Sequence, residues 1–261
     1  NISLSAPLVP LVSSSHAMPA PTDNDIFATT RWTIVLGAKN PENNTTRAQS
    51  ALEELCQTYW YPLYAYVRHR GHNPHDAEDL TQGFFEKLFR LQSLQTVAPD
   101  KGKFRAFLLA SLKNYLADQH DHASAQKRDA RRTFSLDAQA AESRYALEPA
   151  DSLTPENLYE RRWALTLLDT VLTRLAEEYE AQNQADLFNE LRFSIAGEKN
   201  TVPYRDLAAR LDMSEEALRV AVFRLRKRFR KTLREEIAHT VSTKNEIEEE
   251  LNALRKILAA S

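Results

Sequence analysis

Cationic side chains are concentrated between Arg219 and Arg234, where no acidic residue interrupts them. The whole chain of 261 residues has a formal net charge of only −2, so this segment differs sharply from the average. Guanidinium and ammonium groups bind phosphate, and an arginine can also donate two parallel hydrogen bonds to a guanine edge. The segment is therefore a candidate for binding an anionic partner, of which nucleic acid is one.

The same segment has the pattern of an amphipathic helix. At about 100° per residue, its apolar side chains fall within one narrow sector and its cations occupy the remaining surface. The apolar set is Leu218, Val222, Leu225, Phe229 and Leu233. Such a helix packs on one side only, but basic amphipathic helices also lie on anionic membranes or bind acidic proteins, and many have no partner.

The residues before this helix favour DNA as the partner. Residues 204–211 have a helical pattern, the chain breaks at Asp212, and Ser214 is placed to cap the next helix. Ala208 is small enough for two helices to approach, and Leu218 suits the core between them. This is the spacing of a helix-turn-helix, with Asp212 where glycine is favoured. Aspartate enters left-handed conformations more readily than most residues, so the turn can still form.

A second motif, NPHDAEDLTQGFFEKLF, begins at Asn73. Asn73 can cap a helix, and Pro74 suits its first turn. The acids Asp76, Glu78 and Asp79 lie near the positive end of the helix dipole. A structural role explains these residues as well as a functional one, so the motif alone decides nothing.

Together, three stretches resemble the extracytoplasmic-function sigma factors of bacterial RNA polymerase. They are DAEDLTQGFFEKL, FRAFLLASLKNYLADQ and, a domain later, YRDLAARLDMSEEALRVAVFRLRKRFR, and the resemblance covers most of residues 52–237. It implies a region 2 domain, which docks on the beta-prime clamp helices and opens the minus-ten promoter element. It also implies a region 4 helix-turn-helix, which reads the minus-thirty-five element and contacts the beta flap.

The resemblance further implies which residues act at each surface. Those for core-polymerase binding are Asp76, Glu78, Asp79, Leu80, Gln82 and Phe85. Those for the minus-ten element are Lys113, Asn114, Asp118, Gln119, His120, Lys127 and Arg128. Those for the minus-thirty-five element are Ser214, Glu215, Arg219, Val220, Phe223, Arg224 and Lys227. Ala221 and Phe223 stand where the family often has polar or basic residues, so the preferred promoter sequence does not carry over.

Composition predicts an all-α fold. Glycine is scarce, with five residues, and Ala, Leu, Glu and Arg dominate the periodic stretches. The expected segments are a disordered start at 1–26, a region 2 domain at 27–128, a linker at 129–153, a region 4 domain at 154–237 and an amphipathic helical extension at 238–261. The linker could hold one short helix, and the residues before Met18 are a candidate expression remnant.

The extension TKNEIEEELNALRKILAAS carries Ile247, Leu251, Leu254 and Leu258 at helical spacing, together with a cluster of glutamates. The simpler explanation is that this helix packs on region 4 and completes its core. The alternative is that its glutamates lie beside the basic helix, compete with phosphate, and hold DNA binding down in the free protein.

No motif supports catalysis, and no cofactor is expected. His69, His72 and His75 follow regular steps, but these steps cross a glycine and a proline, and no second cluster completes a metal site. The single cysteine, Cys56, excludes an intrachain disulfide and fits a reducing compartment. No apolar run is long enough to span a membrane, so we expect a cytoplasmic protein.

Two other functions stay open. One is a helix-turn-helix regulator that acts without core polymerase, which would leave DAEDLTQGFF and FRAFLLASLKNYL unassigned. The other is an adaptor whose basic helix binds an acidic protein. The resemblance to sigma factors assigns every motif, with bacterial RNA polymerase core and promoter DNA as partners. Whether an anti-sigma factor regulates the protein is not encoded in these motifs.

Overall fold

The computed structural model describes residues 45–89, 103–122, 138–146, 153–196, 202–241 and 243–259. Over these residues every regular element is a helix, so the predicted all-α fold is confirmed. The expected disordered segment 1–26 lies outside the described residues, as do Lys127 and Arg128.

The first group of helices is α3 (Thr45–His69), α4 (Pro74–Phe89) and α5 (Phe104–His122). The chain turns from α3 into α4 at Gly71, whose φ of 95° lies in the left-handed region that favours glycine. Asn73 caps α4 as the sequence predicts, because its Oδ1 accepts a hydrogen bond from the Asp76 amide at 2.9 Å. Capping and the turn together fix where α4 starts.

Helix α6 (Ala138–Tyr145) lies within the predicted linker. Its Glu142 carboxylate accepts hydrogen bonds from Arg68 Nη2 at 2.8 Å and from the Tyr64 hydroxyl at 2.6 Å. These contacts dock the short helix on α3.

Helix α7 (Pro155–Glu180) connects the two halves of the molecule. Its first half packs along α3, where Trp163 is buried and its indole Nε1 donates a hydrogen bond to the Tyr59 hydroxyl at 3.1 Å. Its second half packs against the later helices, with the rings of Tyr179 and Phe188 5.5 Å apart between centroids. The described helices therefore share one apolar core. The boundary between region 2 and region 4 stays a prediction.

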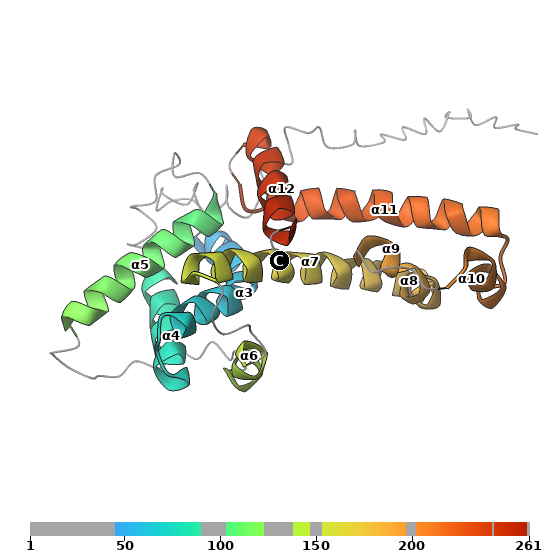
Figure 1. Cartoon of the computed structure of the whole chain (residues 1–261). Coiled ribbons are helices and arrows are strands. Elements are labelled where there is room, and N and C mark those ends of the chain that lie inside the picture. Colours follow the sequence, from blue (N-terminus) through green and yellow to red (C-terminus); the bar gives the residue numbers. More distant parts are fainter. Residues whose placement is uncertain are drawn as a thin grey trace, which may run out of the picture.

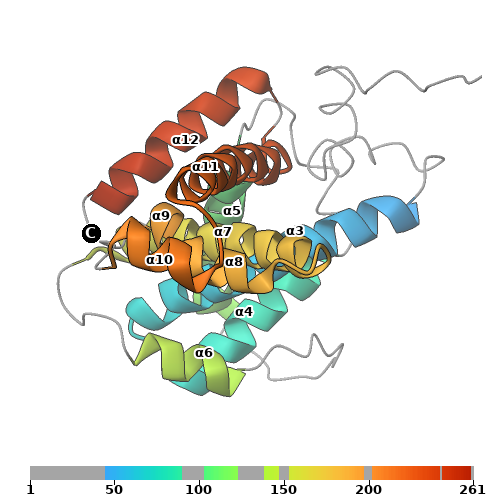
Figure 2. The same ribbon diagram turned by 90° about the vertical axis from the view of Figure 1, so that its right-hand side faces the viewer.

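The remaining helices are α8 (Ala185–Leu191), α9 (Phe193–Ala196), α10 (Tyr204–Arg210), α11 (Glu215–Ala238) and α12 (Lys244–Ala259). Figure 1 shows an elongated molecule, with α3 to α6 at one end, α8 to α10 at the other, and α7 and α11 running side by side. Figure 2 looks almost along the axis of α11. The end of α11 meets the first group of helices, and α12 lies across this junction.

Candidate nucleic-acid interface

Helices α10 and α11 are joined by a tight turn. Asp212 in this turn has a φ of 49°, the left-handed conformation expected at its position. Ser214 caps α11 as predicted, because its Oγ accepts a hydrogen bond from the Ala217 amide at 3.1 Å. Ala208 and Leu218 are buried where the two helices meet. One side of α11 is thereby held against α10, and the other side faces solvent.

The side that faces solvent, here called the α11 outer face, consists of Val220, Phe223, Arg224 and Lys227. Their spacing of three and four residues places them together on the helix. Val220 and Phe223 are apolar yet exposed, to 43% and 65% of full accessibility. Arg224 and Lys227 make no ion pair or hydrogen bond with any described residue. Exposed apolar groups beside free cations suit thymine methyls and phosphates in a major groove.

Several neighbouring cations of α11 are already paired. Arg228 and Arg234 each lie 2.6 Å from a glutamate, on α7 and α12 respectively. Arg219, a predicted DNA-contacting residue, lies 3.7 Å from Glu215, another member of the same predicted set. Arg224 and Lys227 thus differ from these three cations, because neither makes an ion pair with a described residue.

The predicted minus-ten residues on α5 include two that are ion-paired within the molecule. Lys113 Nζ lies 2.6 Å from the carboxylate of Glu156 at the start of α7. Asp118 lies 3.0 Å from Lys87 Nζ of α4. The hydrogen bond between Lys113 and Glu156 lowers the pKa of the carboxyl and raises the pKa of the amine. Any DNA contact by Lys113 must therefore replace an existing partner.

Three other predicted minus-ten residues lie in the second half of α5. The side-chain amides of Asn114 and Gln119 are exposed and free to reach a base edge. The side chain of His120 lies outside the described residues. Unlike Lys113 and Asp118, the side chains of Asn114 and Gln119 are not held in an ion pair within the described part of the chain.

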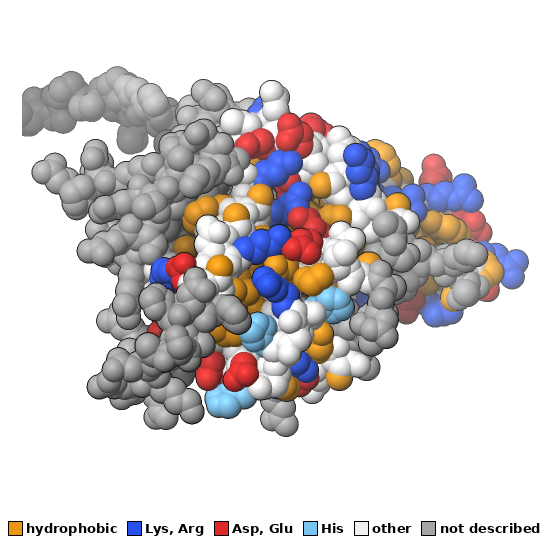
Figure 3. Space-filling view, turned by 60° about the vertical axis from the view of Figure 1, so that its left-hand side comes forward, with side chains coloured by type: hydrophobic (Ala, Val, Ile, Leu, Met, Phe, Trp, Pro, Cys, Tyr) orange, Lys and Arg blue, Asp and Glu red, His pale blue; other side chains and the backbone are white. Residues whose placement is uncertain are grey.

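The acids of α4 are separately placed rather than gathered in one patch. The Asp76 carboxylate accepts a hydrogen bond from Asn73 Nδ2 at 2.7 Å, so it is part of the helix cap. The Asp79 side chain is 65% exposed, and its carboxylate lies 3.7 Å from His75 Nδ1. Glu78 is half-buried. In Figure 3, acidic and basic side chains are interspersed over the face in view, with no continuous region of one sign.

The other predicted core-binding residues of α4 are less accessible. Leu80 and Gln82 are half-buried. Phe85 is buried, and its ring packs 5.9 Å from the ring of Trp60 between centroids. In this structure Phe85 therefore holds α4 in place rather than presenting a surface to a partner.

Sequence reasoning missed the position of Arg105 at the start of α5. Its guanidinium contacts the carboxylates of Glu160 on α7 and Glu250 on α12, and it lies 4.6 Å from the centre of the Trp163 ring. These glutamates are 55 and 145 residues away in the chain, so local spacing cannot indicate the contacts. The available signal is Glu250 itself, which falls three residues after Ile247 on the apolar side of the tail helix.

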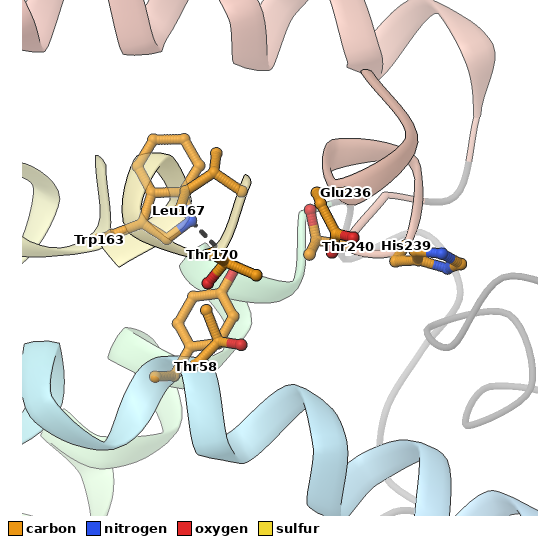
Figure 4. A pocket seen from close by; sticks show the side chains of 8 residues that line it. Thr58, Trp163, Leu167, Thr170, Glu236, His239 and Thr240 are labelled. Carbon is orange, nitrogen blue, oxygen red and sulfur yellow. Dashed lines mark hydrogen bonds between the residues drawn. The ribbon is translucent and has the colours of Figure 1, made fainter. Parts of the chain in front are cut away.

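A small cavity lies where α3, α7 and the end of α11 meet (Figure 4). Thr170, Glu236 and His239 are among its lining residues, and its volume of about 20 Å³ is enough for about one water molecule. The described part of the chain contains no cluster of three His, Cys, Asp or Glu side chains that could bind a metal. None of the described helices has the length and apolar character needed to cross a membrane.

Comparison with known proteins identifies the first group of helices. Residues 55–126 match the family model of sigma-70 region 2, a span that includes the second half of α3 and all of α4 and α5. No curated protein and no solved structure matches the chain. Helices α10 and α11 lie outside the matched span. The chain therefore contains a sigma-70 region 2 domain, and this match supports an RNA polymerase sigma factor of the sigma-70 family, acting in transcription initiation.

Proposed function

We propose that this protein is a sigma factor of the extracytoplasmic-function type, which directs bacterial core RNA polymerase to its promoters. The single observation that carries the proposal is the sigma-70 region 2 match over residues 55–126. Sigma factors are initiation factors that perform no reaction of their own, so the proposed activity is recognition. The order of the motifs along the chain supports the subtype.

The α11 outer face is the proposed contact with the minus-thirty-five element. Arg224 and Lys227 make no ion pair or hydrogen bond with a described residue that DNA binding would have to break, so their charge is available to phosphate. Phe223 and Val220 lose exposed apolar surface when a thymine methyl covers them. Both effects favour insertion of this side of α11 into a major groove.

Helix α5 is the proposed contact with the minus-ten element. Exposed Asn114 and Gln119 supply amide donors and acceptors that can bind the edge of an unstacked base. Lys113 supplies a cation only after leaving Glu156, so promoter phosphate competes with that carboxylate. The strength of this contact therefore depends on a charge of α7.

Helix α4 is the proposed contact with core polymerase. The Asp79 side chain is 65% exposed, whereas Asp76 takes part in the helix cap. The clamp helices expected as the partner of these acids are basic. Opposite charges at such an interface set register and association rate more than raw affinity. Reversing the charge of Asp79 is therefore a direct test of this surface.

One observation favours a second candidate, a DNA-binding regulator that acts without polymerase. Helices α10 and α11 lie outside the region 2 match, and the α11 outer face is exposed to solvent. Such a regulator would bind promoter duplex as the free protein and would not co-purify with core polymerase.

In-vitro transcription with purified bacterial core separates the two candidates. We expect the protein to bind core and to yield a start-specific transcript from promoters of its own genome. Asp79→Arg should weaken core binding, whereas Glu180→Arg, a reversal of an exposed acid at the end of α7, should not. Duplex binding without core binding or transcript would favour the regulator and refute the proposal.

A further inference from the structure

A buried group of charged side chains lies between the start of α5 and the later helices. Arg105 donates hydrogen bonds to the Glu250 carboxylate of α12, from Nε at 2.6 Å and from Nη2 at 3.1 Å, and it also pairs with Glu160 of α7. Lys103 Nζ, just before α5, lies 3.0 Å from Glu250. The Glu250 side chain is only 1% exposed and that of Arg105 only 12%. These four residues are here called the Arg105 cluster.

The Arg105 cluster joins two parts of the molecule that are distant in the chain. Its cations lie within the span that matches sigma-70 region 2, whereas its glutamates lie on α7 and α12, outside that span. Two hydrogen bonds accompany it, each 2.9 Å long. The Phe104 amide donates one to the Thr240 carbonyl after α11, and the Tyr159 hydroxyl of α7 donates the other to the Arg105 carbonyl. The later helices are thus fastened to the start of α5.

Helix α12 belongs to the later helices and reaches α5 through its acids. Its apolar side packs on α7 and α11. Ile247, Leu251 and Leu254 are buried there, whereas Leu258 of the predicted apolar stripe is exposed. Glu248 pairs with Arg234 of α11 at 2.6 Å. Glu250 therefore connects a helix that is seated on one part of the molecule to a cation of the other part.

In this closed arrangement the two candidate DNA-reading regions are too near each other to reach both promoter elements. Figures 1 and 2 agree that α5 and α11 extend in opposite directions from their junction beside α12. At about 1.5 Å per residue, the stretches 104–119 and 220–240 together span about 53 Å even when laid end to end. By their names, the two elements lie about 25 base pairs apart, which is about 85 Å of B-form DNA. The two regions must therefore move apart on the promoter.

Burial makes the Arg105 cluster sensitive to the loss of one member. Desolvation disfavours the charged form of Arg105, but hydrogen bonds and charge from Glu250, together with the charge of Glu160, outweigh this and raise the arginine pKa. Removal of one partner leaves a buried charge uncompensated, which destabilises the packed state strongly. Water solvates the same guanidinium once the two parts separate. Loss of Glu250 should therefore destabilise the closed arrangement and leave the open one unaffected.

We infer that α12 locks the free protein in the closed arrangement through Glu250 and Arg105, and that this lock opens before the protein reads both promoter elements. The inference rests on the proposed function. A protein whose competent form is a minor fraction acts with an affinity reduced by that fraction. The Arg105 cluster thus makes the tail helix an internal restraint on transcription.

This lock differs from the alternative in which the tail glutamates compete with phosphate on the basic helix. Glu248 pairs with Arg234, which lies outside the α11 outer face. Glu249 and Glu250 contact Lys103 and Arg105 at the start of α5. None of these contacts involves Arg224 or Lys227, so the restraint acts on the separation of the two parts.

The first test measures a distance in the free full chain, without polymerase or DNA. Spin labels at Ala117→Cys and Ala217→Cys, both at exposed positions of α5 and α11, report the separation of the two regions, and the native Cys56 is buried. Without further substitution, the labelled chain should give one narrow distribution at short distance. Adding Glu250→Gln, which keeps the shape of the side chain and removes its charge, should produce a broad population at longer distance.

The matched control is Glu248→Gln, which weakens the pair with Arg234 within the later helices and leaves the Arg105 cluster intact. It should keep the narrow distribution. Circular dichroism reports whether each variant is folded. If Glu250→Gln does not fold, Lys103→Ala removes one partner of Glu250 and leaves Arg105 paired, so it should give the same change to a smaller extent.

The second test measures transcription with the unlabelled full chain. The protein is titrated into a fixed amount of core polymerase and promoter template. For Glu250→Gln, the protein concentration that gives half-maximal transcript should fall at least about fivefold, the lower end of typical intramolecular couplings. Glu248→Gln should leave this concentration unchanged.

The outcomes separate the lock from the proposed function. If wild type neither binds core nor gives a transcript, the proposed function is refuted, while the distance measurement still decides whether Glu250 holds the two parts together. A folded Glu250→Gln variant with the narrow, short distribution refutes the lock even where transcription succeeds. A broadened distribution with an unchanged half-maximal concentration also refutes it, because Glu250 then supports packing without restraining activity.

Discussion

The two ends of the molecule differ in whether the charged side chains expected to contact DNA are already held in ion pairs within the protein. At the α4–α5 end, which matches sigma-70 region 2, Lys113 and Asp118 are held by ion pairs. At the α10–α11 end, which lies outside the match, Arg224 and Lys227 are free of ion pairs and hydrogen bonds with described residues. The family match thus indicates the role of the α4–α5 end. At the α10–α11 end, the candidate DNA-binding surface is indicated instead by cations that make no ion pair with a described residue.

This difference has an energetic meaning. A cation without a partner binds phosphate at the cost of its own hydration only, whereas a paired cation must also lose its partner. We therefore expect the free protein to bind duplex DNA mainly through α11. The α5 contacts should matter mainly once polymerase holds the DNA in place.

The largest expected effect concerns the core that supports the matched end. Trp163→Ala removes a fully buried indole, its hydrogen bond to Tyr59 and its contact with Arg105, and should lower the free energy of unfolding by about 3–5 kcal/mol. Phe223→Ala, which truncates an exposed aromatic on the α11 outer face, should change it by less than about 0.5 kcal/mol. Urea denaturation followed by circular dichroism measures both. Equal losses would mean that Phe223 is part of the core.

Much of the local structure behind this comparison can be predicted from sequence. The caps at Asn73 and Ser214 and the left-handed Asp212 follow from side-chain chemistry within a few residues, and each is confirmed. The start of α7 directly after Thr154 follows from the same reasoning. Local rules work here because the interacting groups are neighbours in the chain.

The parts that sequence reasoning missed depend on distant contacts. Phe85 lies on the motif expected to bind polymerase, but Trp60 of α3 covers it. Glu250 lies in a cluster of glutamates that resembles a solvated surface, but its position on the apolar side of α12 buries it beside Arg105. No periodicity in one helix indicates which residue of another helix will lie opposite. Such contacts require the packing of three helices to be known.

The second prediction tests the free cations of α11. Arg224→Ala and Lys227→Ala should each weaken duplex binding by about 1–3 kcal/mol if the contact is to a base, or reduce the salt slope by about one if it is to phosphate. Arg228→Ala removes a cation of the same helix that is already paired with Glu178, so its effect should be smaller. Fluorescence anisotropy over a range of salt concentrations measures all three. If Arg228→Ala weakens binding as much as the others, the pairing does not decide which cations contact DNA.

The third prediction releases the paired cation of α5. Glu156→Gln removes the charge that holds Lys113 and should strengthen binding of holoenzyme to promoter DNA by less than about 1 kcal/mol, the usual range for an exposed ion pair. The double variant with Lys113→Ala should lose the gain, because the freed amine is then absent. Footprinting of promoter complexes at low salt is the measurement. A gain that persists in the double variant would show that Glu156 acts on DNA through another group.

The smallest expected effect is a pH dependence at the linker helix α6. Hydrogen bonds from Arg68, and to a lesser degree from the Tyr64 hydroxyl, hold the pKa of the Glu142 carboxyl below its ordinary value of 4.5. A carboxyl with a lowered pKa in the folded state contributes stability that is present above the unfolded pKa and lost as pH falls through the folded pKa. Docking of α6 on α3 should therefore weaken only in acid, below about pH 4.5.

The comparison of wild type with Glu142→Gln isolates this group, because other carboxyls such as Glu156 titrate in both proteins and cancel in the difference. At neutral pH, wild type should be more stable to urea by up to about 1 kcal/mol, since the ion pair with Arg68 is partly exposed. The gap should close as pH falls through the folded pKa of Glu142, because the protonated carboxyl then resembles the amide. Glu180→Gln, at an exposed acid, should show no such gap at any pH. The lack of a gap for Glu142→Gln at neutral pH would mean that α6 is held by the stacking of Arg68 on Tyr145, 4.8 Å from the ring centre, and not by the carboxylate.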